Sequence, residues 1–365
     1  KNNIQMQLKQ YFRKQNMKKR NLSAKKKIHN FYLKKLNNPI IKKIYLKYRK
    51  NLEFINEKKI SIAVSGGPDS MALVFLSKCY SIQKKINCYY YIVDHKLRIN
   101  STNEAETIKR KLKKFDINCR ILTWKHNNNF SNIQSKARDE RYKLIFKECL
   151  KKKIKFVLTA HQKNDLFENF FIRLFRGSGL KGLSSFNSSK AKIIKENNIY
   201  IFRPLLSIYK KDLINLVNST FGFFANDPSN YNEKFLRIKI RKLINQLNKE
   251  GLDFDSLKLA FDNLYQSNLA IEFYIRQNIE KNSKFFNNNR SIIIKQNFFK
   301  QPNEIVFRSF SEIIHLFGNK HKFTRGSKVL SLIKSINSER VFKKRTLSGC
   351  IFQKVNKSII ISRES

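Results

Sequence analysis

The sequence Ile60-Ser-Ile-Ala-Val64 followed by Ser65-Gly66-Gly67-Pro68-Asp69-Ser70 decides the fold, because an apolar run meets a stretch with helical spacing (69–80) at a glycine pair. A short apolar run of this kind predicts a buried strand. Two glycines allow successive backbone N–H groups to point into one concavity, and the helix N-terminus adds partial positive charge. The segment therefore predicts a phosphate-binding loop between a strand and a helix.

The loop differs from two common phosphate loops, because it has neither a Gly-Lys-Ser/Thr ending nor a Gly-x-Gly-x-x-Gly pattern. The carboxylate of Asp69 would repel a phosphate unless a cation lies between them, so we assign Asp69 to contact with Mg²⁺. The alternative interpretation is an ordinary strand–helix turn in which serine and aspartate cap the helix. Glycine usage favours the phosphate site, because five of only 10 glycines stand in residues 66–67 and 177–182.

Strands and helices alternate through the first two thirds of the chain. Apolar runs predict strands at 60–64, 89–93, 119–124 and 156–159, and helical spacing predicts helices at 69–80, 102–115, 133–151 and 165–176. This order predicts an α/β fold with a Rossmann-like parallel sheet flanked by helices. After about residue 245, helical stretches at 252–282, 304–317 and 325–337 precede a hairpin-like tail, which predicts a smaller, mainly helical α+β C-terminal domain.

Polar residues gather at the predicted strand ends, where parallel sheets bind their ligands. His161, Asp165 and Glu168 follow the fourth strand at spacings of four and three, so on a helix they share a face that suits proton transfer and metal or amine contact. The remaining candidates are Asp94, His95, Lys96 and Arg98 after the second strand, Arg138 and Arg141 in the third helix, and Arg173, Arg176 and Gly177 at the second glycine cluster. Each has a structural alternative: a capped loop, an amphipathic surface helix and a helix C-cap, respectively.

Charge and cysteine usage limit the kinds of partner and cofactor that the chain could bind. Lys and Arg number 76 against 26 Asp and Glu, a net charge of +50, which favours nucleic acid, although the chain is rich in Lys, Asn and Ile throughout. Residues 1–52 contain no acidic residue and read either as a basic arm that touches RNA phosphate or as a leader. The five cysteines form no Cys-x-x-Cys pair, which argues against zinc, iron–sulfur and dithiol centres. No apolar run is long enough to span a membrane or to direct secretion, so we expect a cytoplasmic protein of bacterial type, with an organellar stroma or matrix left open.

The ordered motifs resemble a known family. Residues 65–70 are similar to the pyrophosphatase loop of the N-type ATP pyrophosphatases (the PP-loop superfamily), which cleave ATP between its α- and β-phosphates and adenylate an oxygen. Further motifs resemble the tRNA(Ile)-lysidine synthetases: residues 93–98, 137–142, 159–169 and 173–183, Arg203-Pro204, residues 226–230, Arg237 and Arg241. The resemblance is strong over about 55–245 and weak over 246–365.

The resemblance implies a reaction and a set of partners. Members ligate free L-lysine to carbon 2 of the wobble cytidine of the tRNA(Ile) with anticodon CAU, release AMP and pyrophosphate from ATP with Mg²⁺, and so switch the codon from Met to Ile. The implied domains are a basic N-terminal extension (1–52), a PP-loop ATP pyrophosphatase domain (53–245) and a tRNA-binding domain (246–365). The sequence is compatible with a homodimer.

The resemblance also implies roles for single residues. Ser65, Gly66, Gly67, Pro68, Asp69 and Ser70 would bind ATP, and Asp69 the Mg²⁺. Asp69, Arg138, His161, Asp165 and Glu168 would be catalytic. The substrates would contact Asp94, His95, Lys96, Arg98, Arg173, Arg176, Gly177, Arg237 and Arg241, of which the last two read as RNA contacts or structural bridges.

Four positions within residues 159–169 depart from the family pattern: Gln162 replaces a second histidine, Asn164 a first aspartate, Leu166 a glutamine and Asn169 a threonine. Between Arg237 and Arg241, Ile238 replaces an asparagine. Asp165 and Glu168 must then carry more of the acidic work. Two other functions stay open. A PP-loop tRNA thiolation enzyme would need a thiolate pair or iron–sulfur ligands. A non-catalytic, basic RNA-binding protein would keep a decayed loop.

Overall fold

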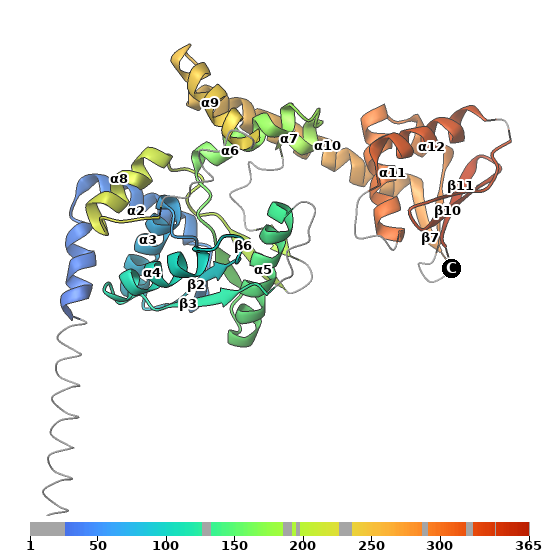
Figure 1. The fold of residues 1–365 in the computed structure, drawn as a ribbon. Helices are drawn as coiled ribbons and strands as arrows, with labels where there is room; N and C mark the ends of the chain where they lie inside the picture. Colours follow the sequence, from blue (N-terminus) through green and yellow to red (C-terminus); the bar gives the residue numbers. More distant parts are fainter. Residues whose placement is uncertain are drawn as a thin grey trace, which may run out of the picture. The chain divides into compact units, whose positions relative to one another are not determined.

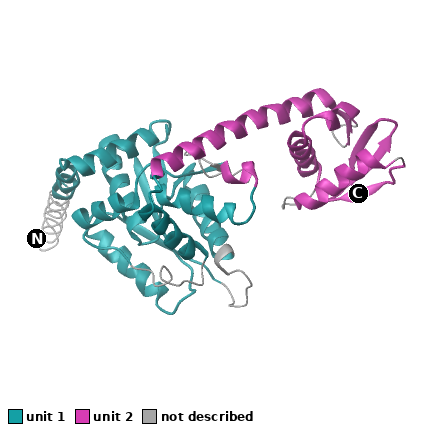
Figure 2. Ribbon diagram, turned by 90° about the horizontal axis from the view of Figure 1, so that it is seen from above, with its two compact units in different colours: residues 1–178, 186–253 teal, residues 179–185, 254–365 magenta. Residues whose placement is uncertain are grey.

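The computed structural model describes residues 26–125, 133–184, 192–194, 198–225, 236–286, 291–318, 324–339 and 341–364. The chain divides into two compact units, residues 1–178 with 186–253 and residues 179–185 with 254–365, which Figure 2 colours separately. Residues 1–25 of the basic N-terminal segment and residues 226–230 of the family pattern lie outside the described residues. Each unit has its own hydrophobic core.

The first unit is built on one six-stranded sheet. Its strands are β1 Lys59–Val64, β2 Asn87–Asp94, β3 Cys119–Thr123, β4 Phe156–Leu158, β5 Lys192–Ile194 and β6 Ile199–Phe202, in the order β3-β2-β1-β4-β6-β5. Five strands are parallel and only the edge strand β5 is antiparallel. On β1, Ile62 pairs with Tyr90 of β2 and with Leu158 of β4. The predicted parallel α/β sheet is confirmed.

Helices cover both faces of this sheet (Figure 1). They are α2 Pro39–Leu52, α3 Pro68–Lys84, α4 Ser101–Lys113, α5 Ile133–Lys152 and α8 Lys210–Thr220, whereas α6 Lys163–Leu174 and α9 Leu236–Lys249 pack against each other. Side chains alternate along β2, so Tyr90 and Ile92 enter the core shared with α2, α3, α4 and α8, whereas Tyr91 enters the core shared with α5. Apolar residues on both faces explain why the central strands read as continuous apolar runs.

The strand order reverses at β1. From β1 the chain proceeds to β2 and β3 on one side of the sheet, whereas β4 and β6 lie on the other side. Ligands of open parallel sheets bind beyond the carboxyl ends of the strands at such a switch point. Residues 65–70 follow β1 and residues 159–162 follow β4, so two of the predicted motifs meet there.

The second unit joins helices to an antiparallel sheet. Its helices are α7 Leu180–Ser184, α10 Phe254–Asn282, α11 Asn303–Phe317 and α12 Gly326–Ser338, with a short 3₁₀ helix, η2, at Gln296–Lys300. Its strands are β7 Ser283–Phe286, β8 Ser291–Ile294, β9 Arg345–Leu347, β10 Cys350–Val355 and β11 Ser358–Arg363, ordered β7-β8-β11-β10-β9. Phe298, Phe310 and Phe352 are fully buried between helices and sheet. The predicted α+β character of this region is confirmed. Over the described part of the chain, no helix combines the length and apolarity needed to cross a bilayer.

Candidate functional site

The glycine loop adopts a conformation that glycine permits. Gly66 has φ +84°, and a Cβ there would lie 3.1 Å from the side chain of Ile108. The Ser70 hydroxyl accepts from the Ser65 N–H (3.2 Å) and donates to the Gly67 carbonyl (2.9 Å), which closes the loop. Gly67 is the N-cap of α3, and among the described residues no side chain caps this helix end. Its backbone N–H groups and positive dipole are therefore arranged for an anion.

Asp69 stands in the first turn of α3 with an unsatisfied acceptor. Its Oδ1 is buried and has no hydrogen-bond partner among the described residues. Burial raises the pKa of Asp69 to about 6, an effect that Lys210 opposes and Asp165 reinforces. A buried carboxylate oxygen without a donor fits Mg²⁺, which takes one or two protein carboxylates and completes its shell with phosphates and water.

The carboxylates predicted as catalytic are held by two arginines of α9. Arg237 donates from Nη2 to Asp165 (2.5 Å) and from Nε to Glu168 (2.5 Å), and Arg241 donates from Nε to Glu168 (2.6 Å). The Glu168 side chain is 3% exposed, whereas those of Arg237 and Arg241 are 36% and 29% exposed. Burial opposes the charge of Arg237, but Asp165 and Glu168 hold its pKa above the ordinary value. These four residues form the carboxylate–arginine cluster, which ties α6 to α9.

His161 lies in a strongly cationic environment. Burial, and then Arg203, Arg138, Arg237 and Arg141, lower the pKa of His161 to about 3. A hydrogen bond of 3.0 Å joins Nδ1 to the Thr159 hydroxyl. His161 is consequently a neutral imidazole at ordinary pH, suited to hydrogen bonding with an anionic ligand.

Asp94 and His95 organise the loop after β2. Asp94 accepts hydrogen bonds from the Ser101 hydroxyl (2.7 Å), the Thr102 hydroxyl (2.6 Å) and the Lys96 N–H (3.0 Å). Burial alone would raise its pKa, but these three donors lower it. His95 Nε2 accepts from Arg141 Nε (3.2 Å), which ties this loop to α5.

Arg138, predicted as catalytic, and Lys96 and Arg98, predicted to contact substrate, lie in different surroundings. Arg138 is exposed, lies over the Tyr142 ring (5.7 Å) and acts on His161, so it belongs to the same cationic environment. Lys96 and Arg98 are exposed on the β2 loop, where Arg98 pairs with Glu104 (3.3 Å).

Arg173 lies in the last turn of α6, about 12 Å along the axis from Asp165 at 1.5 Å per residue, and Arg176 and Gly177 follow the end of this helix. Gly177 has φ +65°, and the N–H groups of Gly177 and Ser178 bond to the carbonyls of Leu174 and Arg173. This arrangement is a glycine C-cap, the structural alternative for that position.

The four departures from the family pattern have structural roles. Gln162 is the N-cap of α6 and accepts from the Asn164 N–H (2.7 Å), and Leu166 is buried. Asn164 Oδ1 accepts from the Lys210 N–H (3.3 Å), and Asn169 donates to the Asp165 carbonyl (2.6 Å). The changed side chains therefore hold α6 in place.

Sequence reasoning missed Lys210 and gave Arg203 no part in the site. Arg203 directly follows β6 and lowers the pKa of His161, and Lys210 opens α8 and acts on Asp69. Both stand after the carboxyl end of a parallel strand. The strand-end rule would have found them if the short strand β6 had been predicted.

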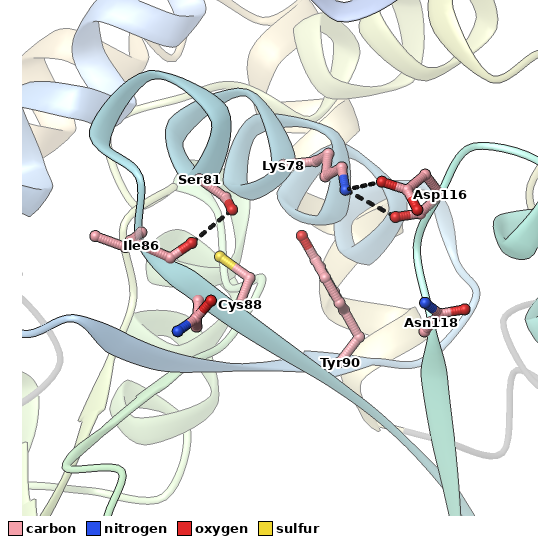
Figure 3. Close-up of a pocket in the computed structure, with 8 residues that line it drawn as sticks. Lys78, Ser81, Ile86, Cys88, Tyr90, Asp116 and Asn118 are labelled. Atoms are coloured by element: carbon pink, nitrogen blue, oxygen red, sulfur yellow. Dashed lines mark hydrogen bonds and ion pairs between the residues drawn. The ribbon is translucent and has the colours of Figure 1, made fainter. Parts of the chain in front are cut away.

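A cavity of about 220 Å³ lies at the opposite, amino-terminal edge of the sheet (Figure 3). Its lining includes the Lys78–Asp116 ion pair (2.8 Å), Cys88 and Tyr90. None of the predicted site residues lines it. We place the candidate site at the switch point, where the loop, the carboxylates and the cationic groups converge.

Fold and site define a class of protein. The family model described as the PP-loop domain matches residues 37–247, which contain the sheet, the glycine loop and the carboxylate–arginine cluster. A solved U34-tRNA thiolase from Methanococcus maripaludis, with its four-iron, four-sulfur cluster, has the same fold, with a TM-score of 0.52 and 18% identity over 62% of this chain and 79% of that one. Proteins of the PP-loop class bind ATP.

Sequence relatives narrow the class. The tRNA(Ile)-lysidine synthase of Rickettsia typhi is 34% identical over 311 residues, 84% of this chain and 70% of that protein. The tRNA(Ile)-lysidine synthase of Orientia tsutsugamushi is 33% identical over 327 residues, 85% of this chain and 71% of that protein. The chain therefore belongs to the tRNA(Ile)-lysidine synthase family of PP-loop enzymes.

Proposed function

We propose that this chain joins the ε-amino group of free L-lysine to carbon 2 of the wobble cytidine in the tRNA(Ile) with anticodon CAU. ATP is consumed to AMP and pyrophosphate, and the product changes the codon read from Met to Ile. One observation carries the proposal: Asp69, in the first turn of α3 directly after the glycine loop, has a buried carboxylate oxygen to which no described residue donates a hydrogen bond.

In the first half-reaction, oxygen 2 of the cytidine attacks the α-phosphate of ATP and pyrophosphate leaves. The N–H groups at the start of α3 would hold the phosphates. Asp69 would hold a Mg²⁺ ion, which supplies neutralisation of the charge that develops on the leaving group. Lys210 and Arg138 would add cationic stabilisation on either side.

In the second half-reaction, the lysine ε-amine attacks carbon 2, AMP leaves with the electrons of the carbon–oxygen bond, and one proton leaves the amine. Asp165 and Glu168 are the carboxylates suited to contact an amine, and Arg237 and Arg241 hold them while no amine is bound. Neutral His161 can donate a hydrogen bond to the nucleotide, and phosphate charge nearby would raise its pKa toward its ordinary range.

The tRNA body would contact basic side chains, mostly through its phosphates. The candidates in the first unit are Arg173 in the last turn of α6, Arg176 after it with the backbone of Gly177, and Lys96 and Arg98 on the loop after β2. We assign residues 53–245 to catalysis and residues 246–365 to tRNA recognition. A homodimer is compatible with this assignment.

The thiolation alternative fits the cysteines poorly. Burial raises the pKa of the Cys88 and Cys119 thiols to about 12 and of the Cys149 and Cys350 thiols to about 11, and it also raises that of Cys79. A sulfur carrier or cluster ligand needs an accessible thiolate.

The test is incubation of the full chain with a tRNA(Ile) CAU transcript, ATP, Mg²⁺ and labelled lysine. We expect label in the tRNA and one AMP and one pyrophosphate for each lysine joined. Asp69→Ala should abolish incorporation, whereas Asp139→Ala, which removes an exposed carboxylate of α5, should not. Release of pyrophosphate without lysine in the tRNA, or full activity of Asp69→Ala, would contradict the proposal.

A further inference from the structure

One face of the first unit is rich in exposed lysines, and the first acidic residue after them is Glu53, the C-cap of α2. Residues 26–52 contain no Asp or Glu. The helical residues 26–35 and α2 expose Lys26, Lys27, Lys34, Lys42, Lys43, Lys47 and Lys50, and none of these lysines forms an ion pair with another described residue. Other helices of this unit differ, because Lys109 pairs with Glu106 and Lys143 with Glu140. We call this surface the acid-free face.

The acid-free face is a rigid surface. Ile41, Ile44, Tyr45, Tyr48 and Leu52 of α2 are buried at helical spacing against the main core. The hydroxyl of Tyr48 shares a hydrogen bond with Ser77 (2.8 Å), and that of Tyr45 donates to Gln83 (2.7 Å). With this stripe buried, Lys43, Lys47 and Lys50 point away from the core along one line about 10 Å long, at 1.5 Å per residue.

The helical residues 26–35 are fixed as well. The Tyr32 hydroxyl donates to the Phe115 carbonyl (2.8 Å), and Lys35 donates to the Ser219 carbonyl at the end of α8 (2.6 Å). These residues precede the PP-loop family match, which begins at residue 37. They are thus an addition to the matched domain that is folded onto it.

The acid-free face reaches the edge of the sheet that carries the site. Asn51, at the end of α2, donates to the Pro204 carbonyl (2.8 Å), directly after Arg203. The last turn of α2 adds Arg49 and Lys50. A polyanion lying along α2 would therefore arrive beside the segment that carries Arg203.

We propose that the acid-free face binds the sugar–phosphate backbone of the substrate tRNA. This inference rests on the tRNA substrate of the proposed function. Exposed lysines present point charges that attract phosphates without reading sequence. Leu33, Ile40 and Leu46 are also exposed on these helices, which would suit an anionic lipid surface, but the reaction on tRNA favours RNA.

The test compares two triple variants of the full chain. Lys43→Ala, Lys47→Ala and Lys50→Ala remove the stripe of α2. Lys84→Ala, Lys113→Ala and Lys147→Ala remove the same charge from exposed positions of α3, α4 and α5, where these lysines also form no ion pair with the described residues. Binding of the tRNA(Ile) CAU transcript is measured from 50 to 200 mM salt, together with kcat and KM for lysine incorporation.

The stripe variant should reduce the log–log salt slope of tRNA affinity by about two to three, roughly one for each lysine. Over this fourfold salt range the wild type should lose about 16- to 64-fold more affinity than the stripe variant. KM for tRNA should rise while kcat stays within about twofold. The scattered variant should keep a slope within about one of the wild type.

Equal slopes for the two variants would overturn the inference. So would a stripe variant with wild-type tRNA binding that no longer sediments with phosphatidylglycerol–phosphatidylethanolamine vesicles, since that would assign the face to lipid. Failure of the proposed function can be distinguished from failure of this inference, because the wild type would then incorporate no lysine into the tRNA.

Discussion

Replacing Asp69 by Asn should make the free protein more stable while it abolishes activity. Burial raises the pKa of this carboxyl from 3.8 to about 6, so the folded protein favours the protonated form. At pH 7.5 the carboxylate is charged in both states, and the folded state carries a desolvation cost. The difference between the two pKa values corresponds to about 3 kcal/mol of unfolding free energy at 1.36 kcal/mol per pH unit.

The pH dependence fixes the sign of this effect. Between about pH 4 and pH 6 the folded protein binds more protons at Asp69 than the unfolded chain, so this group lowers the unfolding free energy as pH rises through that window. Above the window the cost is complete. The gain from Asp69→Asn should therefore be about 3 kcal/mol at pH 7.5 and about half of that at pH 5.

Urea unfolding followed by tryptophan fluorescence measures this gain in the first unit of the structure, which contains Asp69. Trp124 is the single tryptophan of the chain, is 7% exposed and lies edge-on to His95 in the first unit. Asp139→Asn is the matched control, because it removes the same charge from an exposed position of α5. Mg²⁺ with ATP should raise the unfolding midpoint of the wild type and not that of Asp69→Asn.

Two results would refute this reasoning. An Asp69→Asn protein that is no more stable than the wild type at pH 7.5 would show that the carboxylate is not held at a cost. Equal gains at pH 5 and pH 7.5 would assign the effect to packing instead of charge.

Two further predictions use the same fluorescence assay. Lowering the pH from 7.5 to 5.5 should cost the wild type about 1.4 kcal/mol more unfolding free energy than it costs His161→Gln. The pKa of His161 is 6.5 in the unfolded chain and about 3 in the folded protein, so its contribution to stability is lost as pH falls below 6.5. Equal losses in the two proteins would show that His161 is charged. Arg241→Met should cost about 2 kcal/mol and Glu168→Gln about 3 kcal/mol, because each change removes one partner of a buried ion pair. The double variant should cost at least 1 kcal/mol less than the sum of the two, and additive costs would show that the two side chains do not interact.

The parallel sheet and the glycine loop were predictable because both depend on neighbouring residues. Apolar runs mark β1 to β4, and glycine clustering marks the sharp turn at Gly66, where the structure requires positive φ. The strand β6, Ile199–Phe202, was not predicted, although it is apolar and one residue longer than β4, Phe156–Leu158, which was predicted. Because β6 was not predicted, the position of Arg203 at the end of a parallel strand was not recognised either.

The partners of the acidic residues were less predictable. Asp165 and Glu168 stand on one helical face, which the spacing predicts, but their arginines are 69 to 73 residues away in sequence. Only the packing of α6 against α9 makes these pairs. Asp94 is similar, because its strand-end position predicts a ligand contact, whereas three local donors bind it instead.

Helix α6 carries the two carboxylates of the carboxylate–arginine cluster in its first half and Arg173 in its last turn, and Arg176 follows directly after its end. A continuous α-helix acts as a ruler, so insertion of one residue near its middle would rotate the arginines by about 100° relative to Glu168, whereas a four-residue insertion would nearly restore their direction but move them about 6 Å further away. The enzyme should consequently tolerate changes in the loop after Gly177 far better than changes in the length of α6.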